Sequence, residues 1–370
     1  MKGGPVNLRI PGPTPCPPQV LEATAKPMID HRSPQFAELL NDVVRRLKWF
    51  YKTQGDVLIL TASGTGGMEA AVVNTLSPGD KVLAVTIGAF GDRFAAIAQT
   101  YGAEVVRLEY EWGKAADPED IRRSLQEDPA IKAVLVTHNE TSTGVTNPLP
   151  EIARVVKEHE KLLLVDAVSS LGALPVETDA WGLDVVVTGS QKGWMVPPGL
   201  AFVSMSQEAW NAYTKAKMPR FYLDLGRHKD YLERGQTPWT PALSILYGLQ
   251  VALQMMGEEG LEKIIARHAY IGRLTREGVK ALGLNLLADE AYASNTVTAV
   301  KVPAGIDVRT LRRLLQEEHG VVVAGGQGKL QGQIFRIGHL GWVTEDDVRQ
   351  VLDALAQVLP KVGFQVPIRP

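Results

Sequence analysis

Residues Leu162–Trp194 read LLLVDAVSSLGALPVETDAWGLDVVVTGSQKGW. The runs Leu162–Val168 and Asp184–Ser190 are apolar along most of their length instead of alternating between apolar and polar residues. This pattern is typical of strands buried on both faces of a sheet that helices cover. Asp166 lies near the end of the first run, and Lys192 follows the second. Because such sheets bind ligands at the carboxyl ends of their strands, both residues are candidate site residues.

The alternation of strand and helix continues on both sides of this stretch. The pattern predicts strands at Val57–Ala62, Lys81–Gly88, Glu104–Tyr110, Ile131–His138 and Gly199–Met205. Between them it predicts helices at Met68–Leu76, Asp92–Tyr101, Asp117–Asp128 and Leu149–His159. This order and spacing predict an α/β domain with a mainly parallel sheet and helices on both faces.

The pattern changes after about Pro241. Two long helical stretches, Ala242–Met256 and Leu261–Leu282, lead into predicted strands at Asn295–Pro303 and Gln333–Gly341 and helices at Val308–Glu318 and Glu345–Val358. We therefore expect a large α/β domain over residues 21–255 and a smaller α+β domain over residues 256–370. An N-terminal segment containing Pro11, Pro13, Pro15, Pro17 and Pro18 is expected to be non-helical, within an extended arm over residues 1–20.

Composition narrows the class of protein. The 370 residues carry 39 Lys or Arg and 41 Asp or Glu, so charge gives no reason to expect a nucleic-acid partner. No apolar run approaches the roughly 20 residues of a membrane span, and the N-terminus lacks the apolar core of a signal peptide. One cysteine, Cys16, cannot form an intrachain disulfide or a zinc cluster. We expect a cytoplasmic protein with no membrane partner and no metal site.

A glycine-rich loop, Ala62–Gly67, lies between a predicted strand and a predicted helix. Glycines there let backbone N–H groups approach an anion, and the helix N-terminus adds partial positive charge. The loop lacks both the Gly-Lys-Ser/Thr of a Walker loop and the G-x-G-x-x-G of a dinucleotide site. It is a candidate phosphate site, and a turn needed only to reverse the chain is the alternative.

Asp166 and Lys192 are candidates for polar chemistry at the strand ends. A carboxylate at the end of a buried strand is costly unless a cation or several donors surround it. Asp166 is therefore a candidate partner for a substrate cation, a metal or a protonated heterocycle, or else a helix N-cap. Lys192 precedes Gly193 and Trp194, where desolvation would lower its pKa and favour Schiff-base chemistry. A solvated loop lysine is the alternative.

Two further residues complete a set. Arg336 lies in the apolar run Ile334–Gly338 and needs a carboxylate or phosphate, unless it forms a structural ion pair. Phe90 follows a strand end, where it could stack on a ring or simply fill the core. A phosphate loop, an aspartate, a lysine and an arginine on one α/β scaffold match the needs of pyridoxal phosphate (PLP) and an amino-acid carboxylate.

Seven segments also resemble the class V, fold-type I aminotransferases, especially the alanine/serine–glyoxylate aminotransferase group. That group includes a subunit once described as the small subunit of a soluble hydrogenase. The segments are Pro11–Pro15, His31–Pro34, Ser63–Thr65, His138–Gly144, Val165–Ser170, Gly189–Lys192 and Arg336–Gly338. The resemblance runs nearly end to end, its most specific part is Glu140–Lys192, and it implies the PLP-dependent transferase fold of type I.

The resemblance also implies roles for the matching residues. Lys192 would hold PLP as a Schiff base, Asp166 would pair with the pyridine nitrogen, and Thr141 would lie near the ring O3′. The remaining implied cofactor contacts are ring stacking by Phe90, phosphate binding by Ser63, Gly64, Thr65 and Gln191, and a further contact by Val168. Two sequence differences leave the cofactor unchanged: Phe90 stands where a tryptophan is often found, and Thr65 where some animal relatives have a histidine.

Substrate and subunit contacts follow from the same resemblance. Arg336 would bind the substrate α-carboxylate, while Gly12 and Thr14 belong to a loop that closes over the substrate. A neighbouring subunit would complete the phosphate site with Thr237 or Thr240. The resemblance thus implies a homodimer with shared active sites, burying roughly 2,000 Å² or more.

The implied activity is amino transfer, by a ping-pong mechanism, from alanine or serine to a 2-oxo acid such as glyoxylate or pyruvate. Aspartate is an alternative donor if Arg93 or Arg227 meets its side chain. A PLP-dependent lyase stays open on the same fold. A cysteine desulfurase is disfavoured because the only cysteine is Cys16, and a non-catalytic structural subunit because the lysine, aspartate and arginine are intact. A Rossmann dehydrogenase lacks its glycine fingerprint.

Overall fold

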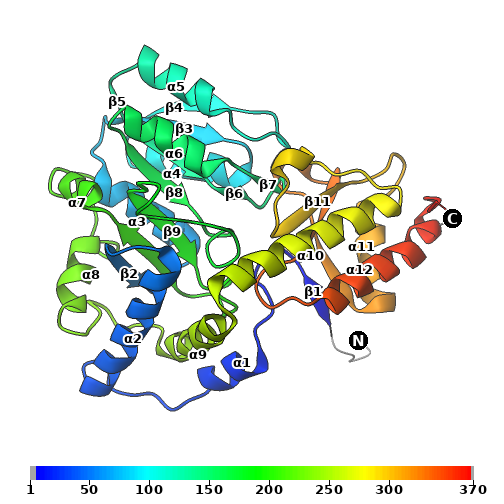
Figure 1. Cartoon of the computed structure of the whole chain (residues 1–370), viewed down its shortest axis with the longest axis horizontal. Coiled ribbons are helices and arrows are strands. Elements are labelled where there is room, and N and C mark those ends of the chain that lie inside the picture. The colour runs from blue at the N-terminus through cyan, green and yellow to red at the C-terminus, as the bar shows by residue number, and fades with distance from the viewer. Residues whose placement is uncertain (1–5, 368–370) are drawn as a thin grey trace.

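A computed structural model describes residues 6–367 and contains a seven-stranded sheet (Figure 1). Its strand order is β2-β10-β9-β8-β5-β3-β4. The strands are β2 (Asp56–Leu60), β3 (Lys81–Thr86), β4 (Glu104–Glu109), β5 (Ile131–Thr137), β8 (Leu162–Asp166), β9 (Val185–Gly189) and β10 (Ala201–Met205). Strand β10 alone runs in the opposite direction to the other six strands, which confirms the mainly parallel sheet.

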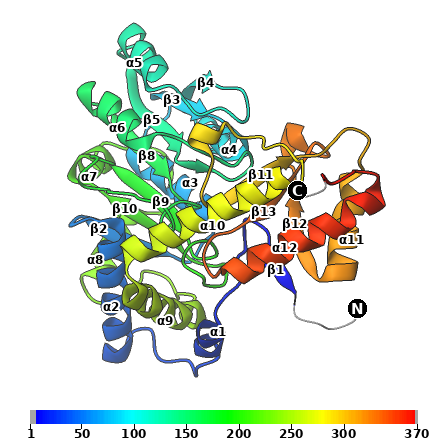
Figure 2. The same ribbon diagram turned by 45° about the vertical axis from the view of Figure 1, so that its right-hand side comes forward.

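Helices cover both faces of this sheet (Figures 1 and 2). On one face the strands pack with α2 (Pro34–Tyr51), α5 (Pro118–Glu127) and α6 (Leu149–Glu158). On the other face they pack with α3 (Gly64–Thr75), α4 (Ala89–Thr100), α7 (Gln207–Tyr213) and α8 (Leu225–Leu232). Along β5, Val134 joins the first core and Leu135 the second, which explains why the buried strands are apolar throughout.

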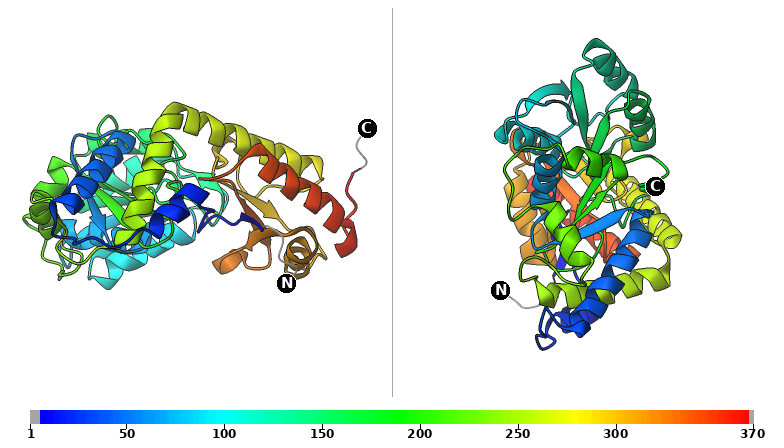
Figure 3. Two further views of the ribbon diagram at one scale, coloured as in Figure 1. Left: turned by 90° about the horizontal axis from the view of Figure 1, so that it is seen from below. Right: turned by 90° about the vertical axis from the view of Figure 1, so that its left-hand side faces the viewer.

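A second, four-stranded sheet has the order β1-β12-β13-β11. Its strands are β1 (Asn7–Arg9), β11 (Val297–Lys301), β12 (Val321–Gly325) and β13 (Ile334–Gly338). This sheet shares a core with α10 (Leu261–Ala281), α11 (Val308–His319) and α12 (Glu345–Val358). Figure 3 shows α10 extending from the larger lobe along the smaller one, after α9 (Leu243–Glu259). The smaller α+β part is therefore confirmed, while its limit at residue 255/256 stays a prediction.

The N-terminal arm joins the two sheets. Its strand β1 pairs in parallel with β12, and helix α1 (Pro18–Thr24) packs against α9. The expectation that Pro18 is non-helical is wrong, because the first helical position needs no backbone N–H and tolerates proline. The outermost residues of the arm and of the C-terminal domain, 1–5 and 368–370, lie outside the described part.

Short elements complete the chain. They are the hairpin strands β6 (Asn139–Glu140) and β7 (Val145–Thr146) and the 3₁₀ turns η1 (Glu290–Tyr292), η2 (Gly328–Leu330) and η3 (Pro360–Val362). None of the helices within residues 6–367 is long and apolar enough to cross a membrane.

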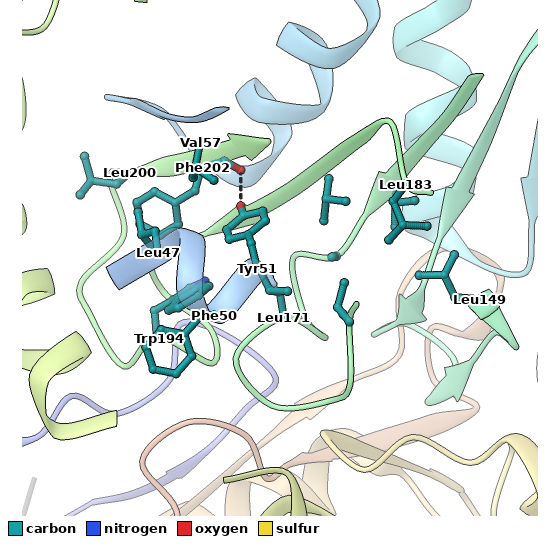
Figure 4. Packing of buried hydrophobic residues seen from close by; sticks show 14 of the residues in the cluster. Leu47, Phe50, Tyr51, Val57, Leu149, Leu171, Leu183, Trp194, Leu200 and Phe202 are labelled. Carbon is teal, nitrogen blue, oxygen red and sulfur yellow. Dashed lines mark hydrogen bonds between the residues drawn. The ribbon is translucent and has the colours of Figure 1, made fainter. Parts of the chain in front are cut away.

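An aromatic cluster fixes the chain just beyond Lys192 (Figure 4). Trp194 is fully buried, stacks on Tyr51 and meets the rings of Phe50 and Phe202 edge-on. The Tyr51 hydroxyl donates a hydrogen bond of 2.9 Å to the Phe202 carbonyl. Because burial of large aromatic rings contributes strongly to stability, this cluster holds the loop after β9 in place.

Candidate active site

Lys192 lies beyond β9, beneath the N-terminal arm. Its side chain is buried, and Nζ donates a hydrogen bond of 2.8 Å to the Pro11 carbonyl. Burial lowers the pKa of this amine to about 8; Asp166 opposes the shift, and the charges of Arg336 and Arg93 add to it. The structure thus rejects the solvated-lysine alternative and gives an amine that is readily deprotonated.

Asp166 ends the neighbouring strand β8. One carboxylate oxygen accepts the Val168 N–H at 2.9 Å, and the other accepts the Thr137 hydroxyl at 3.3 Å. Burial raises the pKa of Asp166 to about 6, although these hydrogen bonds and the Lys192 charge act in the opposite direction. A carboxylate with this pKa is mostly ionised at neutral pH and can pair with a protonated heterocycle.

The glycine-rich loop opens helix α3. The Ser63 hydroxyl is exposed and does not cap this helix, so the first-turn N–H groups remain directed at the site. A Cβ on Gly64 would lie 2.7 Å from a methyl group of Val168, which places the loop directly against the chain after Asp166. Gln191 lies next to Gly189 and Gly64, and its buried Oε1 has no hydrogen-bond partner within residues 6–367.

Phe90 lies in the first turn of helix α4, beside this loop. The fully buried Glu140 holds the helix start, because its Oε2 accepts the N–H groups of Phe90 and Gly91 at 3.0 and 3.1 Å. The Phe90 ring is half-buried, and the Arg93 guanidinium lies 4.6 Å from its centre. Arg93 also donates a 3.1 Å hydrogen bond to the Thr65 hydroxyl. Phe90 therefore borders the site and is not a simple core residue.

Arg336 reaches the same region from β13 of the smaller sheet. Its Nε donates to the Gly325 carbonyl at 2.9 Å, and Nη1 donates to the Thr141 carbonyl at 3.0 Å. The side chain is buried but forms no ion pair within residues 6–367, which rules out a structural ion pair within this part of the chain. Burial lowers the pKa of Arg336 to about 10, with Glu140 opposing the shift.

Thr141 connects this arginine to the ends of the large sheet. Its hydroxyl donates to the Ser169 hydroxyl at 3.1 Å, and Ser169 in turn donates to the Asn139 carbonyl at 2.8 Å. Asn139 also donates to the Thr296 hydroxyl of the smaller lobe at 2.9 Å. The Thr141 turn is thus fixed by a buried network that spans both lobes.

The N-terminal arm passes directly over Lys192. A Cβ on Gly12 would lie only 2.6 Å from Nζ of Lys192, so this close approach requires glycine. Thr14 ties the arm down: its backbone N–H donates to the Gln191 carbonyl at 3.0 Å, and its hydroxyl donates to the Lys192 carbonyl at 2.9 Å. The two predicted arm residues therefore contact the lysine loop itself.

Thr237 and Thr240 are not brought to this site by contacts within one chain. The Thr237 hydroxyl is buried and donates to the Trp239 carbonyl at 2.7 Å. Thr240 is exposed, and its hydroxyl makes no hydrogen bond within the described residues. Trp239 donates to the Tyr222 carbonyl, and Tyr222 donates to the Thr61 carbonyl near the glycine loop. Of the two threonines, only Thr240 presents its hydroxyl on the surface of the chain.

The residues fit PLP by several independent features. A phosphate requires N–H donors, and the uncapped start of α3 and the amide of Gln191 supply them. An aldehyde requires a readily deprotonated amine, which Lys192 supplies, and a pyridine nitrogen requires a carboxylate, which Asp166 supplies. Fold and site together define a PLP-dependent enzyme that acts on a carboxylate-bearing substrate.

Comparison with known proteins narrows this class. The sequence profile of the family Aminotransferase class-V matches residues 6–342. The chain therefore belongs to the class-V aminotransferases; it is a transaminase, and its cofactor is pyridoxal 5′-phosphate.

Named relatives match almost the whole chain. It is 47% identical to the soluble hydrogenase small subunit of Synechococcus sp., over 96% of this chain and 94% of that protein. It is 40% identical to the serine–glyoxylate aminotransferase of Methylorubrum extorquens (92% and 87% covered) and 38% identical to the L-aspartate–glyoxylate aminotransferase of Paracoccus denitrificans (97% and 92%). A solved structure of an alanine–glyoxylate aminotransferase from Nostoc sp. has a TM-score of 0.92 at 33% identity, with 97% and 96% of the chains covered.

Some site residues were missed by sequence reasoning. The family resemblance gives Glu140 no role, although a glutamate four residues before the turn glycine Gly144, in an otherwise uncharged stretch, is an unusual charge to bury. Gln327, beside Arg336, lies in a glycine-rich loop with no signal of its own. The contacts of Glu140 with Phe90 and of Gln327 with Arg336 depend on how separate segments fold together, which the hydrophobic periodicity of the sequence does not indicate.

Proposed function

We propose that this enzyme transfers the amino group of a small L-amino acid, alanine or serine, to a 2-oxo acid such as glyoxylate or pyruvate. The observation that carries the proposal is the juxtaposition of two buried cations without ion-pair partners in the described chain. The Lys192 amine and the Arg336 guanidinium lie close enough for the charge of Arg336 to lower the pKa of Lys192. An amino acid could place its amino group beside Lys192 and its carboxylate on Arg336.

The protein's own residues divide the work. Bound PLP supplies an electron sink that acidifies the Cα proton of the substrate. We propose that Asp166 keeps the cofactor's ring nitrogen protonated, that Ser63, Gly64, Thr65 and Gln191 hold its phosphate, and that Phe90 stacks on its ring. Val168, packed on Gly64, and Thr141 would complete the wall around the ring.

Lys192 is proposed to act twice. Its amine would hold the cofactor in the resting enzyme, and during turnover the freed Nζ would take the proton from the substrate Cα. A pKa of about 8 suits this base, since a fraction of the amine is neutral at physiological pH. The Pro11 carbonyl, which accepts from Nζ, keeps the amine beneath the arm.

Arg336 is proposed to orient the substrate. Its Nε and Nη1 are anchored on backbone carbonyls, so the guanidinium plane is fixed before the substrate arrives. A carboxylate bound to this plane leaves the rest of a small amino acid directed toward Lys192. Gly12 and Thr14 would close the site above it, which excludes water from the reacting atoms.

One observation favours aspartate as a second donor. Arg93 lies between Thr65 and the Phe90 ring and has no carboxylate partner within residues 6–367. A dicarboxylate could place its side-chain carboxylate there. Arg227 is less suited, because it already lies 3.9 Å from Asp224. The Paracoccus denitrificans relative named for aspartate agrees with this option.

We also propose a homodimer in which Thr240 completes the partner's phosphate site, and a cytoplasmic location. The exposed Thr240 lies beside the surface aromatic residues Phe221, Tyr222 and Trp239. Large aromatic residues are enriched at stable subunit interfaces. A reducing compartment suits a chain with one cysteine.

A panel of half-reactions tests the function. Each L-amino acid is added alone to the PLP-loaded enzyme, and conversion of the bound cofactor to its amine form is followed by visible absorbance. Alanine or serine should convert the cofactor fastest, and glyoxylate or pyruvate should then convert its amine form back to the aldehyde form. Lys192→Ala should abolish both the conversion and the absorbance of the cofactor bound to the lysine. If the wild-type enzyme binds PLP but none of the amino acids converts the cofactor to its amine form, amino transfer is refuted.

A further inference from the structure

Arg336 has a third, weaker acceptor besides its two backbone anchors. Nη1 also donates to Oε1 of Gln327, at 3.4 Å, compared with 2.9 and 3.0 Å for the backbone carbonyls of Gly325 and Thr141. Nη2 makes no hydrogen bond within residues 6–367. Within the described residues, Nη2 thus has no acceptor, and Nη1 is shared between the Thr141 carbonyl and the Gln327 side chain.

The two acceptors of Nη1 differ in how readily they can move. The Thr141 carbonyl belongs to a buried turn whose hydroxyl network reaches both lobes. Gln327 contributes a half-buried side chain from the glycine-rich loop between β12 and β13. The tip of that loop rests on the large lobe, with the Lys329 amine 4.5 Å from the Trp112 ring centre. Rotation of one glutamine side chain is therefore enough to remove one of the two acceptors of Nη1, while the loop stays in place.

A carboxylate binds a guanidinium best through two parallel N–H···O bonds. On Arg336 the nitrogens Nη1 and Nη2 form such a pair of donors; Nη2 makes no hydrogen bond within residues 6–367, whereas Nη1 already donates to Thr141 and Gln327. A carboxylate that binds both nitrogens would have to take the place of the weaker acceptor of Nη1, the Gln327 oxygen. Gln327 therefore competes with the substrate for one of the two bonds.

We propose that Gln327 is a displaceable internal ligand of Arg336 that sets the affinity of the enzyme for the carboxylate of its 2-amino and 2-oxo acid substrates. This inference rests on the proposed function only in taking Arg336 as the carboxylate site. In the absence of substrate, the neutral amide partly satisfies a buried cation without the strong attraction of a carboxylate. Bound substrate would then be released more readily than from an unopposed guanidinium.

Acetate binding tests the proposal, because acetate has a carboxylate but no amino or oxo group to react. Its dissociation constant is measured by calorimetric titration of the PLP-loaded enzyme, and its inhibition constant against the amino donor. The variants are Gln327→Leu, which removes the competing oxygen, and Gln327→Glu, which replaces it with a charged competitor. Gln331→Leu is the matched control, since Gln331 is an exposed residue of the same loop whose side chain makes no hydrogen bond within the described chain.

The proposal expects the two Gln327 variants to change in opposite directions. Gln327→Leu should bind acetate roughly three- to tenfold more tightly, and Gln327→Glu roughly tenfold or more weakly, while Gln331→Leu stays at the wild-type value. A glutamine with a merely structural role would weaken binding in both variants. Unchanged or weaker binding by Gln327→Leu would overturn the proposal.

The titration separates this inference from the proposed function. Acetate binding requires no turnover, so an opposite response of the two variants would support the role of Gln327 even if the half-reactions failed. Arg336→Ala should abolish acetate binding; retained binding there would show that Arg336 is not the carboxylate site and would also overturn the proposal.

Discussion

The buried amine of Lys192 illustrates how a reactive residue costs stability. Burial disfavours its charged form, and Asp166 offsets only part of that effect, so the pKa falls from 10.5 to about 8. When the pKa of a group is lower in the folded chain than in the unfolded chain, its contribution to stability is fully present only at a pH above the unfolded pKa. That stability is lost as the pH falls from about 10.5 to about 8, because over this range the unfolded chain takes up the proton and the folded chain does not.

Lys192→Met should therefore stabilise the cofactor-free protein. At pH 7 we expect the free energy of unfolding to rise by about 1 to 3 kcal/mol, since a charge is no longer buried. The gain should shrink toward zero near pH 10.5, where the lysine is neutral in both states. Urea denaturation at several pH values measures this. The exposed Lys263→Met is the control and should show no such trend; a gain for Lys192→Met that is independent of pH would contradict the explanation.

The residues that sequence reasoning found are those whose type alone is informative at a strand end. Asp166 and Lys192 each carry a charge directly beside an apolar run, and both are buried as expected. Resemblance supplied Gly12, whose contact with the lysine amine could not be derived from a proline-rich segment. Glu140 and Gln327 act through partners 50 and 9 residues away, respectively, so their contacts become visible only in three dimensions.

At the scale of elements, Glu140 replaces the usual N-cap of α4. The N-cap position is Gly88, which has no side chain, and a Cβ there would lie 2.4 Å from Glu140. The carboxylate instead accepts the N–H groups of Phe90 and Gly91, while its other oxygen accepts the N–H and hydroxyl of Ser142. The start of α4, and with it the Phe90 ring, is thus set by a distant segment.

Glu140→Gln should loosen this helix start. A glutamine has one acceptor oxygen, so its amide NH₂ would face at least one pair of donors. We expect the free energy of unfolding to fall by about 1 to 3 kcal/mol and PLP to bind more weakly, because the Phe90 ring loses its position. Denaturation and cofactor titration measure the two effects. Glu151→Gln, an exposed first-turn residue of α6, is the control, and an equal effect there would contradict the capping role.

Helix α10 supports the loop of Lys192 through Gly341. His268 accepts the Gly341 N–H at 3.0 Å, and Arg267 donates to the Gly341 carbonyl at 3.1 Å. Gly341 has φ near +73°, and a Cβ there would lie 2.9 Å from the Lys192 carbonyl. Two adjacent residues of one helix therefore hold the turn that supports the lysine loop.

His268→Leu should weaken this support, whereas His268→Gln should preserve most of it. Loss of the acceptor leaves a buried N–H unpaired, at a cost of about 1 to 3 kcal/mol, and glutamine can supply an oxygen in its place. Burial also lowers the pKa of His268 to about 3, helped by the Arg267 charge. Its contribution to stability is therefore present above the unfolded pKa near 6.5 and is lost as the pH falls toward 3. Acid denaturation of His268→Gln should be less steep; an unchanged slope would contradict this.

Elements were predicted where their pattern was regular and missed where it was short or preceded the alternating region. The amphipathic helix α2 begins with Ser33 as N-cap and Pro34 at its first position, a start signal that the sequence does contain. Strand β12 contains three valines, but its partner β1 has only three residues, a pattern too short to indicate a strand. The parallel pairing of β1 with β12 was therefore not predicted. A pairing across more than 300 residues cannot be inferred from local sequence.

At the scale of the whole molecule, one chain carries the lysine, the aspartate and the arginine, and the proposed dimer would add Thr240 of the second copy to the phosphate site. Thr240 is exposed beside a surface aromatic cluster, whereas Thr237 is buried and its hydroxyl donates a hydrogen bond to the Trp239 carbonyl. If the proposed dimer is correct, each site takes Lys192 from one subunit and Thr240 from the other. That geometry is open to a complementation test.

Two inactive variants should restore each other when mixed. Lys192→Ala removes the amine, and Thr240→Asp places a negative charge against the phosphate, so each homodimer should be inactive or nearly so. In a mixed dimer, one site combines the intact Lys192 of the second variant with the intact Thr240 of the first, while the other site carries both changes. Random assembly makes half of the dimers mixed, so co-expression should recover about a quarter of wild-type activity. Thr237→Asp, changed at the buried position, should not give this pattern; recovery near zero for Thr240→Asp would mean that each site is built from a single chain.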